Sequence, residues 1–344
     1  MIRKTTTAAI IVFCGIMLAA CFQAAAAAGK DWKLEEEKDG IKSYSRVVEN
    51  SKYHAFKATT TIDATLAQIG AVLRDVPSYP EWMARVKHAE VLKRYSPNDM
   101  NVYLILNFPW PTSDRDAVAT AKTEISGDLP GTITTTRIME DTEVPEKDGL
   151  VRVPAMLQQY IMSFKEMKKT EITFSIFLEA GGNLPAMTVN PSLESVPHES
   201  LKNLKDFVKK DQYKDANPFN PVNMPVSKTI AESILRTRFN DPHIIETVLA
   251  DAKLVEITLN GGFSEEGLKE TTAAIMGEYV KTPYFKDDIQ PREDTELLAQ
   301  LTTNREMLDE MVEDEEILEL ILSEGAMTGP VMDAMALFVK DEMN

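Results

Sequence analysis

The chain has 344 residues, of which 44% are hydrophobic, and a formal net charge of −17. This length is typical of two domains, and the apolar fraction is enough for at least one ordinary buried core. A charge of this sign and size repels nucleic acid and anionic membrane surfaces. Basic patches with interleaved aromatic residues do not occur, which also argues against a nucleic-acid-binding protein.

Residues 1–28 have the pattern of a secretory signal peptide. Arg3 and Lys4 form a short basic region, and an apolar run followed by an alanine tract extends to Ala28. An uncleaved membrane helix is a competing interpretation, because the 21 residues from Ala8 to Ala28 are just long enough to span a bilayer. We favour the signal peptide because alanine is only weakly hydrophobic.

Two cleavage sites fit this segment. Residues 18–21, which read LAAC, resemble a bacterial lipoprotein box, in which Cys21 becomes the lipidated first residue. The small residues 26–28 instead fit ordinary secretion. The two readings predict a soluble periplasmic protein or an outer-membrane-attached lipoprotein. Because Cys14 and Cys21 are the only cysteines, the mature chain would have no disulfide and no cysteine-ligated metal.

From residue 32 to about 188 the pattern is mostly that of β-strands. Residues 32–37 and 41–47 flank Asp39-Gly40 and predict a hairpin, and 53–62 predicts a third strand. Asp63 is placed to cap a helix whose apolar residues recur at helical spacing. Further strands are predicted at 102–108, 132–139 and 169–178, the last with the clearest alternation.

Helical patterns begin after these strands. Residues 197–210 carry a stripe of Leu201, Leu204 and Val208, which would be buried against a curved antiparallel sheet. Pro191 and Pro197 are expected to break the helix or delay its start.

Residues 214–227 are rich in proline and asparagine, and they predict a linker between two domains. Residues 228–344 are helical and repeat themselves with an offset of 63 residues, as units of about 228–280 and 291–343. Such units are expected to pack on one another. Between 287 and 319 the chain has thirteen acidic residues and only Arg292 and Arg305 as bases. This stretch predicts a solvated face or, alternatively, a docking face for a cationic partner in the envelope or a weak binding site for divalent cations.

No catalytic motif is evident. The four histidines are widely separated, which argues against a zinc site, and the G-x-S-x-G, G-x-G-x-x-G and phosphate-loop motifs are absent. Nothing in the chain predicts an enzyme, a metal or a cofactor.

Three motifs resemble the START domains, which are lipid-transfer domains related to steroidogenic acute regulatory protein. Residues 109–116, PWPTSDRD, are similar to the family's P-W-P-x-S-x-R-D signature. Residues 39–46, DGIKSYSR, are similar to its D-G-I-x-V-Y-x-R strand, and residues 79–83, YPEWM, to a helix-end motif. The chain departs from the family's pattern at Glu179-Ala180 before the double glycine, at Met187 in place of a tryptophan, and near Tyr160, where another tryptophan is replaced. Pro191 and Pro197 in the last helix are further departures.

The resemblance covers residues 30–213 and implies an α+β helix-grip fold, in which a curved antiparallel sheet wraps around a long C-terminal helix and a hydrophobic tunnel lies between them. An all-α helical repeat domain would follow. The residues that would line the cavity or contact a lipid are Trp82, Met83, Phe108, Arg115, Met156, Phe174, Ile176, Leu204 and Phe207.

The corner at residues 107–116 suggests a structural role beside the cavity. The prolines would end a strand, Trp110 would pack under the corner, and the charges would hold the next strand. Arg115 could instead contact a ligand, but we favour an ion pair with Asp114, Asp116 or a distant carboxylate.

Taken together, the sequence predicts a non-catalytic protein that binds or transfers a lipid in the bacterial cell envelope. Sterol, phospholipid, fatty acid and hopanoid all fit as ligands. A polyketide cyclase/aromatase-like enzyme that uses the same cavity is the first alternative, and an interaction scaffold without a ligand is the second.

Overall fold

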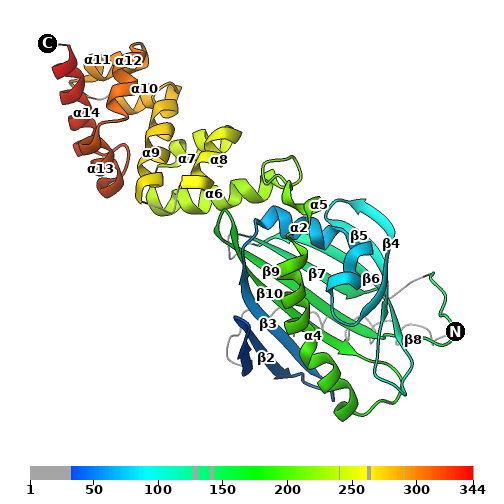
Figure 1. The fold of residues 1–344 in the computed structure, drawn as a ribbon. Coiled ribbons are helices and arrows are strands. Elements are labelled where there is room, and N and C mark those ends of the chain that lie inside the picture. Colours follow the sequence, from blue (N-terminus) through cyan, green and yellow to red (C-terminus); the bar gives the residue numbers. More distant parts are fainter. Residues whose placement is uncertain are drawn as a thin grey trace, which may run out of the picture.

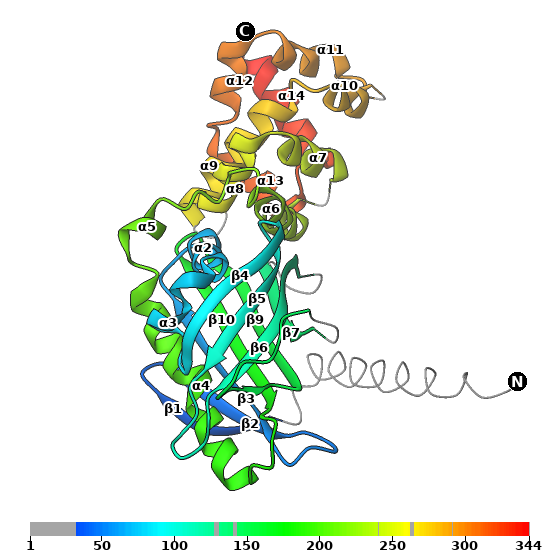
Figure 2. The same cartoon turned by 90° about the vertical axis from the view of Figure 1, so that its right-hand side faces the viewer.

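The computed structural model describes residues 32–126, 131–139, 143–239, 241–261, 265–290 and 292–343. The predicted signal peptide and Cys21 lie outside these residues. Within them, a curved antiparallel sheet carries a long helix across one face, and only helices follow (Figures 1 and 2). This confirms the predicted helix-grip fold with further helices after it. In the described part of the chain, no helix combines the length and the apolar character that crossing a bilayer requires.

The strands follow one another across the sheet in the order β1-β2-β3-β10-β9-β7-β6-β5-β4, and β8 lies beside β6. Neighbouring strands are antiparallel, except that β8 runs parallel to β6. The inner side chains of β10 are buried, as the alternating pattern predicts. The strands are β1 (Lys33–Lys38), β2 (Ile41–Val47), β3 (His54–Ile62), β4 (Val86–Ser96), β5 (Asp99–Leu106), β6 (Arg115–Ile125), β7 (Gly131–Ile138), β8 (Val151–Arg152), β9 (Ala155–Glu166) and β10 (Lys169–Glu179).

Short helices connect β3 to β4. They are α2 (Leu66–Arg74), the 3₁₀ turn η1 (Val76–Ser78) and α3 (Tyr79–Trp82). The expected cap at Asp63 is wrong, because Thr65 caps α2. Its Oγ1 accepts a hydrogen bond from the Gln68 backbone N at 3.1 Å, and Gln68 Oε1 accepts one from the Thr65 backbone N at 2.9 Å. This reciprocal pair satisfies two donors at the start of the helix.

The long helix α4 (Ala186–Phe207) lies across β2, β3 and β10. It begins eleven residues before Pro197 and continues through Pro191 and Pro197, so the expected break is wrong. Each proline removes one backbone hydrogen bond. Burial of one face against the sheet holds the helix together nonetheless. That face consists of Val189, Leu193, Val196, Leu201 and Leu204.

The remaining helices are α5 (Asp211–Lys214), α6 (Met224–Arg238), α7 (Pro242–Ala250), α8 (Ala252–Gly261), α9 (Glu265–Tyr279), α10 (Pro283–Ile289), α11 (Thr295–Leu298), η2 (Ala299–Thr302), α12 (Arg305–Met311), α13 (Glu315–Glu324) and α14 (Gly329–Glu342). The starts of α7 and α8 recur 63 residues later as the starts of α12 and α13. Their caps recur as well, because Asp251 and Asp314 both accept backbone hydrogen bonds at the start of a helix.

The segment before α6 is shorter than the linker expected at 214–227. Helix α6 begins at Met224, and Pro225 lies in its first turn, where a missing N–H is tolerated. The preceding turn is held by Asn220, whose Oδ1 accepts hydrogen bonds from the backbone N of Val222 at 3.0 Å and of Asn223 at 2.9 Å. This segment is therefore folded in the structure.

Buried apolar side chains form two clusters. One lies between the sheet and α4, and the other lies within the helices after residue 224. Phe164, at the end of β9, belongs to the second cluster, and Leu66 of α2 packs against both. The sheet end and the helices after it are therefore in apolar contact.

Candidate functional site

A pocket lies between the sheet and the N-terminal half of α4. Its cavity volume is about 20 Å³, which is room for about one water molecule. Phe108 follows β5, Ile176 and Leu178 come from β10, and Leu193 and Val196 come from α4. These apolar side chains make most of the wall. This volume is far below that of pockets that hold small ligands, so the side chains of the wall nearly fill the site in this structure.

An aromatic cluster closes the pocket on one side. The rings of Tyr160 and Phe174 stack with centroids 4.2 Å apart, and Trp82 lies edge-on to Tyr160 at 6.2 Å. Phe207 of α4 packs on Trp82 at 6.4 Å. Tyr160 and Phe174 are paired neighbours on β9 and β10, one inward position beyond Gln158 and Ile176. The continuous tunnel that the family resemblance implies is therefore interrupted here by packed rings.

Two polar groups of this cluster have no hydrogen-bond partner. The Tyr160 hydroxyl and the Trp82 Nε1 are both buried, and neither bonds to any described residue. Burial raises the pKa of the Tyr160 hydroxyl well above its usual value, because the charged form would be desolvated. A neutral hydroxyl beside the pocket can serve a ligand as donor or acceptor.

The pocket wall itself carries two polar side chains. Gln158, on the inner face of β9, is only 4% exposed, and its amide makes no hydrogen bond to the described residues. Arg85 has a buried Nε without a partner and a backbone φ of 67°. The unusual backbone is fixed by the Asn107 backbone N, which donates to the Arg85 carbonyl at 2.7 Å. Unpaired amide and guanidinium groups in an apolar wall can orient a polar group of a ligand.

The corner after β5 borders this pocket. Asp114 Oδ1 accepts a hydrogen bond from the Phe108 backbone N at 3.2 Å, and Asp114 Oδ2 accepts one from Lys87 Nζ at 2.9 Å. The Lys87 hydrogen bond lowers the pKa of the Asp114 carboxyl. Trp110 does not pack under the corner, as the sequence suggested, but is 93% exposed. Phe108 fills the space beneath the corner instead.

Among the described residues, Arg115 does not form the ion pair that the sequence favoured. Its Nε donates to the Ala180 carbonyl at 3.0 Å, and its Nη1 donates to the Ser113 carbonyl. The guanidinium lies 4.4 Å from the centroid of the Phe108 ring. Burial lowers the pKa of Arg115. This side chain is thus structural, and it ties the corner to the segment before α4.

The neighbouring Asp116 forms an ion pair, and its partner is Arg152 rather than Arg115. Arg152 donates to Asp116 from Nε at 3.0 Å and from Nη2 at 2.9 Å, and the Tyr103 hydroxyl donates to Asp116 Oδ2 at 3.1 Å. Burial and the Asp116 charge raise the pKa of Tyr103 to about 12. The Asp116 hydrogen bond raises the pKa of Arg152. A two-pronged pair of this kind fixes β6 against β8.

Among the residues predicted for the cavity, Phe108 and Ile176 line the pocket. Trp82, Phe174 and Phe207 belong to the aromatic cluster, Met156 and Leu204 are buried in the core, and Met83 lines a shallow outer groove. The sequence analysis missed Gln158 and Arg85. The position of Gln158, at an inward site of a strand, would have been the signal.

A curved sheet closed by a helix around a small apolar pocket defines a class of proteins that enclose an apolar ligand. Metal-binding groups of three or more histidine, cysteine or acidic residues are not found among the residues that the structure describes.

A family model described as START domain matches residues 17–214, which is more than half of the chain. The protein therefore belongs to the START domain family, whose members include lipid-binding and lipid-transfer proteins.

Individual relatives agree with this assignment. An uncharacterized protein of Pseudomonas aeruginosa is 32% identical over 196 residues, which are 57% of this chain and 96% of that protein. The phosphatidylcholine transfer protein of Mus musculus is 26% identical over 191 residues, covering 54% of this chain and 86% of the relative.

Solved structures were also matched. A StAR-related lipid transfer protein fragment from Xanthomonas axonopodis is 28% identical, with a TM-score of 0.48, and the match covers 53% of this chain and 100% of that one. An aromatase/cyclase from a Streptomyces species is 15% identical, with a TM-score of 0.33, and the match covers 45% of this chain and 93% of that one.

Proposed function

We propose that the protein binds the apolar part of one lipid in the pocket between the sheet and α4 and carries it within the bacterial cell envelope. The observation that carries this proposal is the apolar wall of the pocket with Gln158 as an unbonded polar group in it. Each methylene moved from water into such a pocket contributes about 0.8 kcal/mol. Burial alone can therefore hold a lipid, and Gln158 can orient its polar group.

The pocket must widen to admit a ligand of this kind. Not even one acyl chain fits the present cavity of about 20 Å³. The N-terminal half of α4 is the wall best suited to move, because Pro191 and Pro197 each remove one of its backbone hydrogen bonds. Displacement of Tyr160 and Phe174 would then join the pocket to the space behind the aromatic cluster.

Two exposed apolar side chains lie on the segments that border the pocket. Trp110 is 93% exposed and follows Phe108, and Met187 is 83% exposed at the start of α4. The net charge of −17 repels anionic lipid surfaces. We infer that these two side chains make the contact with a membrane while a lipid enters or leaves, since large exposed apolar groups mark such surfaces.

The envelope location belongs to the same proposal and is supported by residues 1–28. Lipidation at Cys21 would attach the protein to a membrane, and cleavage after Ala28 would release it. Expression of the full chain in a bacterium, followed by fractionation and mass measurement of the N-terminal peptide, distinguishes the two products. Recovery of an unprocessed chain in the cytoplasm would contradict both.

A cyclase-like enzyme is the second candidate, and the pocket wall gives it little support. Acid–base chemistry needs groups that exchange protons near neutral pH. Arg85 is the one titratable residue among those that line this pocket, and a guanidinium does not give up its proton there.

Native mass spectrometry of the full mature protein after exposure to a bacterial lipid extract tests the proposal. We expect Ile176→Trp, which fills the pocket, to carry one bound lipid per chain fewer than the wild type. Ser175→Trp is the matched control, because position 175 lies on the opposite face of the same strand. A protein that retains no lipid, or retains it equally in both variants, would rule out this pocket.

A further inference from the structure

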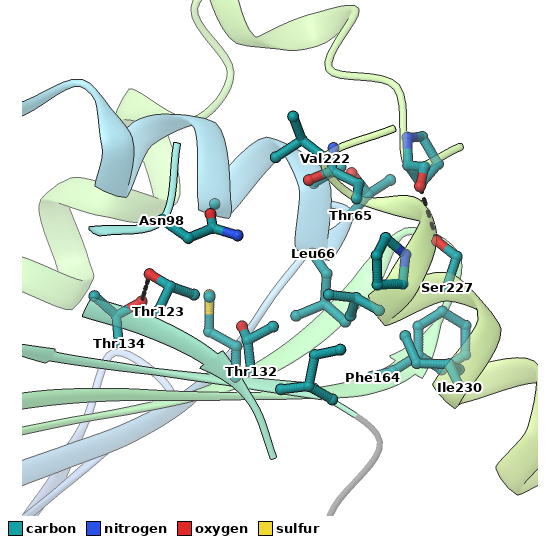
Figure 3. A pocket seen from close by; sticks show the side chains of 18 of the residues that line it. Thr65, Leu66, Asn98, Thr123, Thr132, Thr134, Phe164, Val222, Ser227 and Ile230 are labelled. Atoms are coloured by element: carbon teal, nitrogen blue, oxygen red, sulfur yellow. Dashed lines mark hydrogen bonds between the residues drawn. The ribbon is translucent and has the colours of Figure 1, made fainter. Parts of the chain in front are cut away.

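A second and larger pocket lies at the other end of the inner sheet face, where the sheet meets the helical part of the chain (Figure 3). Its cavity volume is about 110 Å³, against about 20 Å³ for the pocket under α4, and it is open to solvent. Its walls come from α2, β6, β7, β9, the segment before α6, and α6 itself. Met162, one inward position beyond Tyr160 on β9, forms part of this wall. The aromatic cluster therefore stands between the two pockets.

The lining of this pocket changes character from one side to the other. Figure 3 shows Asn98, Thr123 and Thr134 together on one side, and Phe164 and Ile230 on the other. Phe164 and Ile230 both belong to the apolar cluster of the helical part. A ligand that fits this wall has one polar end and one apolar end.

Two buried polar atoms at this pocket have no hydrogen-bond partner among the described residues. The Oγ1 of Thr132 and the Oδ1 of Asn98 are buried and bond to no described residue. Thr132 is only 6% exposed, and Figure 3 places it on the wall between the polar and the apolar side. Leaving such a group unpaired costs about 1–3 kcal/mol, so a ligand that bonds to it recovers free energy.

A positive charge lies at the polar side. Arg74, in the last turn of α2, lines the pocket and takes part in none of the ion pairs among the described residues. Its guanidinium folds back over Gly70, where an added Cβ would lie 3.2 Å from Arg74 Nη1. Burial, together with the nearby Arg94, lowers the pKa of Arg74. The glycine thus gives the guanidinium a place on the pocket wall.

One carboxylate also borders the pocket, and it is already neutralised. Glu124 is exposed and accepts a hydrogen bond from Lys122 Nζ at 2.6 Å. The unpaired charge at the polar side is therefore that of Arg74. An anionic group gains a charge-assisted hydrogen bond from a guanidinium. Rotation of the Asn98 amide about its last side-chain bond would turn its NH₂ donor toward the same anion.

We propose that this pocket binds a single-chain amphiphile with an anionic head group. The head group lies on Arg74 and Asn98, and the acyl chain lies against Leu66, Phe164 and Ile230. Because α6 supplies part of the wall, the bound chain bridges the START domain and the helices after it. The site is distinct from the pocket under α4, and nothing in it depends on the function proposed for that pocket.

The test uses the full mature protein with dodecanoate and, as the neutral match, dodecan-1-ol, both below the concentration at which they aggregate. Binding is measured by calorimetry and native mass spectrometry. We expect Arg74→Gln to weaken dodecanoate binding about tenfold or more, and to change dodecanol binding less than about twofold. Lys93→Gln, an equal change of charge at an exposed position on the neighbouring strand β4, should leave both unchanged.

Two space-filling variants then locate the site. Ile230→Trp should abolish binding of both compounds, whereas Ile176→Trp, in the pocket under α4, should leave it intact. Circular dichroism checks that each variant folds. If Ile230→Trp does not fold, the loss of dodecanoate binding in Arg74→Gln is the result that tests the site. The proposal is overturned if dodecanoate does not bind, if Arg74→Gln binds it as tightly as wild type, or if Ile176→Trp abolishes its binding. The last result would assign the fatty acid to the pocket under α4 and leave the proposed function standing.

Discussion

At the scale of single residues, the polar side chains buried beside the pocket under α4 fall into two kinds. Asp116 has three hydrogen bonds from Arg152 and Tyr103, and Arg115 has two backbone carbonyls. Gln158 has no such partner. The first kind fixes the fold around the pocket, and Gln158 is available to a ligand.

Replacement of Gln158 by leucine should have opposite effects on stability and binding. The free energy of unfolding should rise by about 1 kcal/mol, because an unpaired buried amide is removed. Lipid affinity should fall about tenfold, because the polar group of the ligand loses its hydrogen bond. Urea unfolding and native mass spectrometry measure the two effects. Gln159→Leu is the control, since Gln159 faces outward and its Nε2 donates to Thr135 Oγ1 at 3.5 Å. Unchanged affinity in Gln158→Leu would remove this residue from the site.

The corner at Asp114 should be sensitive to acid. The Lys87 hydrogen bond lowers the pKa of Asp114 in the folded protein below the ordinary value of 3.8. The stabilisation from this pair is therefore fully present above the unfolded pKa and is lost as the pH falls below it. Asp114→Asn should unfold with a weaker dependence on pH in this acidic window, measured by urea unfolding between about pH 6 and pH 3. An identical pH dependence in wild type and variant would show that the pair does not contribute.

At the scale of elements, α4 combines a buried face with two prolines. Its C-terminal half is tied to the rest of the domain by Ser200, whose Oγ accepts a hydrogen bond from the Ala84 backbone N at 3.0 Å, and by Asn203, whose Nδ2 donates to the Trp82 carbonyl at 3.0 Å. The N-terminal half carries Pro191 and Pro197 and lines the pocket. The N-terminal half is tied to β3 by Asn190, whose Oδ1 accepts a hydrogen bond from the His54 backbone N at 3.0 Å, so the two halves differ in their prolines rather than in having side-chain ties.

Restoring the missing hydrogen bonds should stiffen this helix. Pro191→Ala combined with Pro197→Ala should raise the free energy of unfolding by about 1–3 kcal/mol, because alanine restores the backbone N–H and removes the ring clash. The rate of lipid exchange between vesicles should fall, because opening of the helix costs more. Pro242→Ala, in the first turn of α7, is the control in which proline is already tolerated. Faster or unchanged exchange in the double variant would show that α4 does not open.

Strands could be predicted from the sequence where apolar side chains alternate with polar ones, because one face of such a strand is buried and the other is exposed. Strand β10 alternates clearly and was predicted almost to the residue. Strand β9 was missed, because Gln158 points inward while the outward-facing Leu157 and Ile161 are apolar. Because Gln158 is polar at an inward position, the sequence analysis also did not predict it as part of the pocket wall. The sequence analysis correctly predicted that Phe108 and Ile176 line the pocket. It also predicted Trp82 and Phe174, which pack on other rings instead, because residue type alone does not tell a ring that lines a pocket from one that packs in the core.

At the scale of the whole molecule, the START domain and the helices after it meet through apolar side chains. Phe164 is carried by β9 but belongs to the apolar cluster of the helical part, together with Ile230 of α6. The helices after residue 224 thus cover one end of the sheet. This contact predicts that the two parts stabilise each other.

Phe164→Ala should uncouple them. Loss of this side chain should lower the free energy of unfolding by about 3–5 kcal/mol, as for other buried phenylalanines. Scanning calorimetry should then resolve separate transitions for the sheet and the helices. Phe177→Ala, in the cluster between the sheet and α4, should cost a similar amount without separating the transitions. A single transition in Phe164→Ala would mean that coupling does not depend on this contact.

The exposed position of Trp110 allows its fluorescence to be used to detect contact with a membrane. The chain has three tryptophans; Trp82 is almost fully buried, Trp32 is partly exposed beside Arg46 and Lys57, and Trp110 is 93% exposed. Emission from an indole moves to shorter wavelength when it leaves water for hydrocarbon. Mixing the unlabelled protein with vesicles should therefore produce a blue shift to which Trp110 contributes most, and Trp110→Phe should remove most of it.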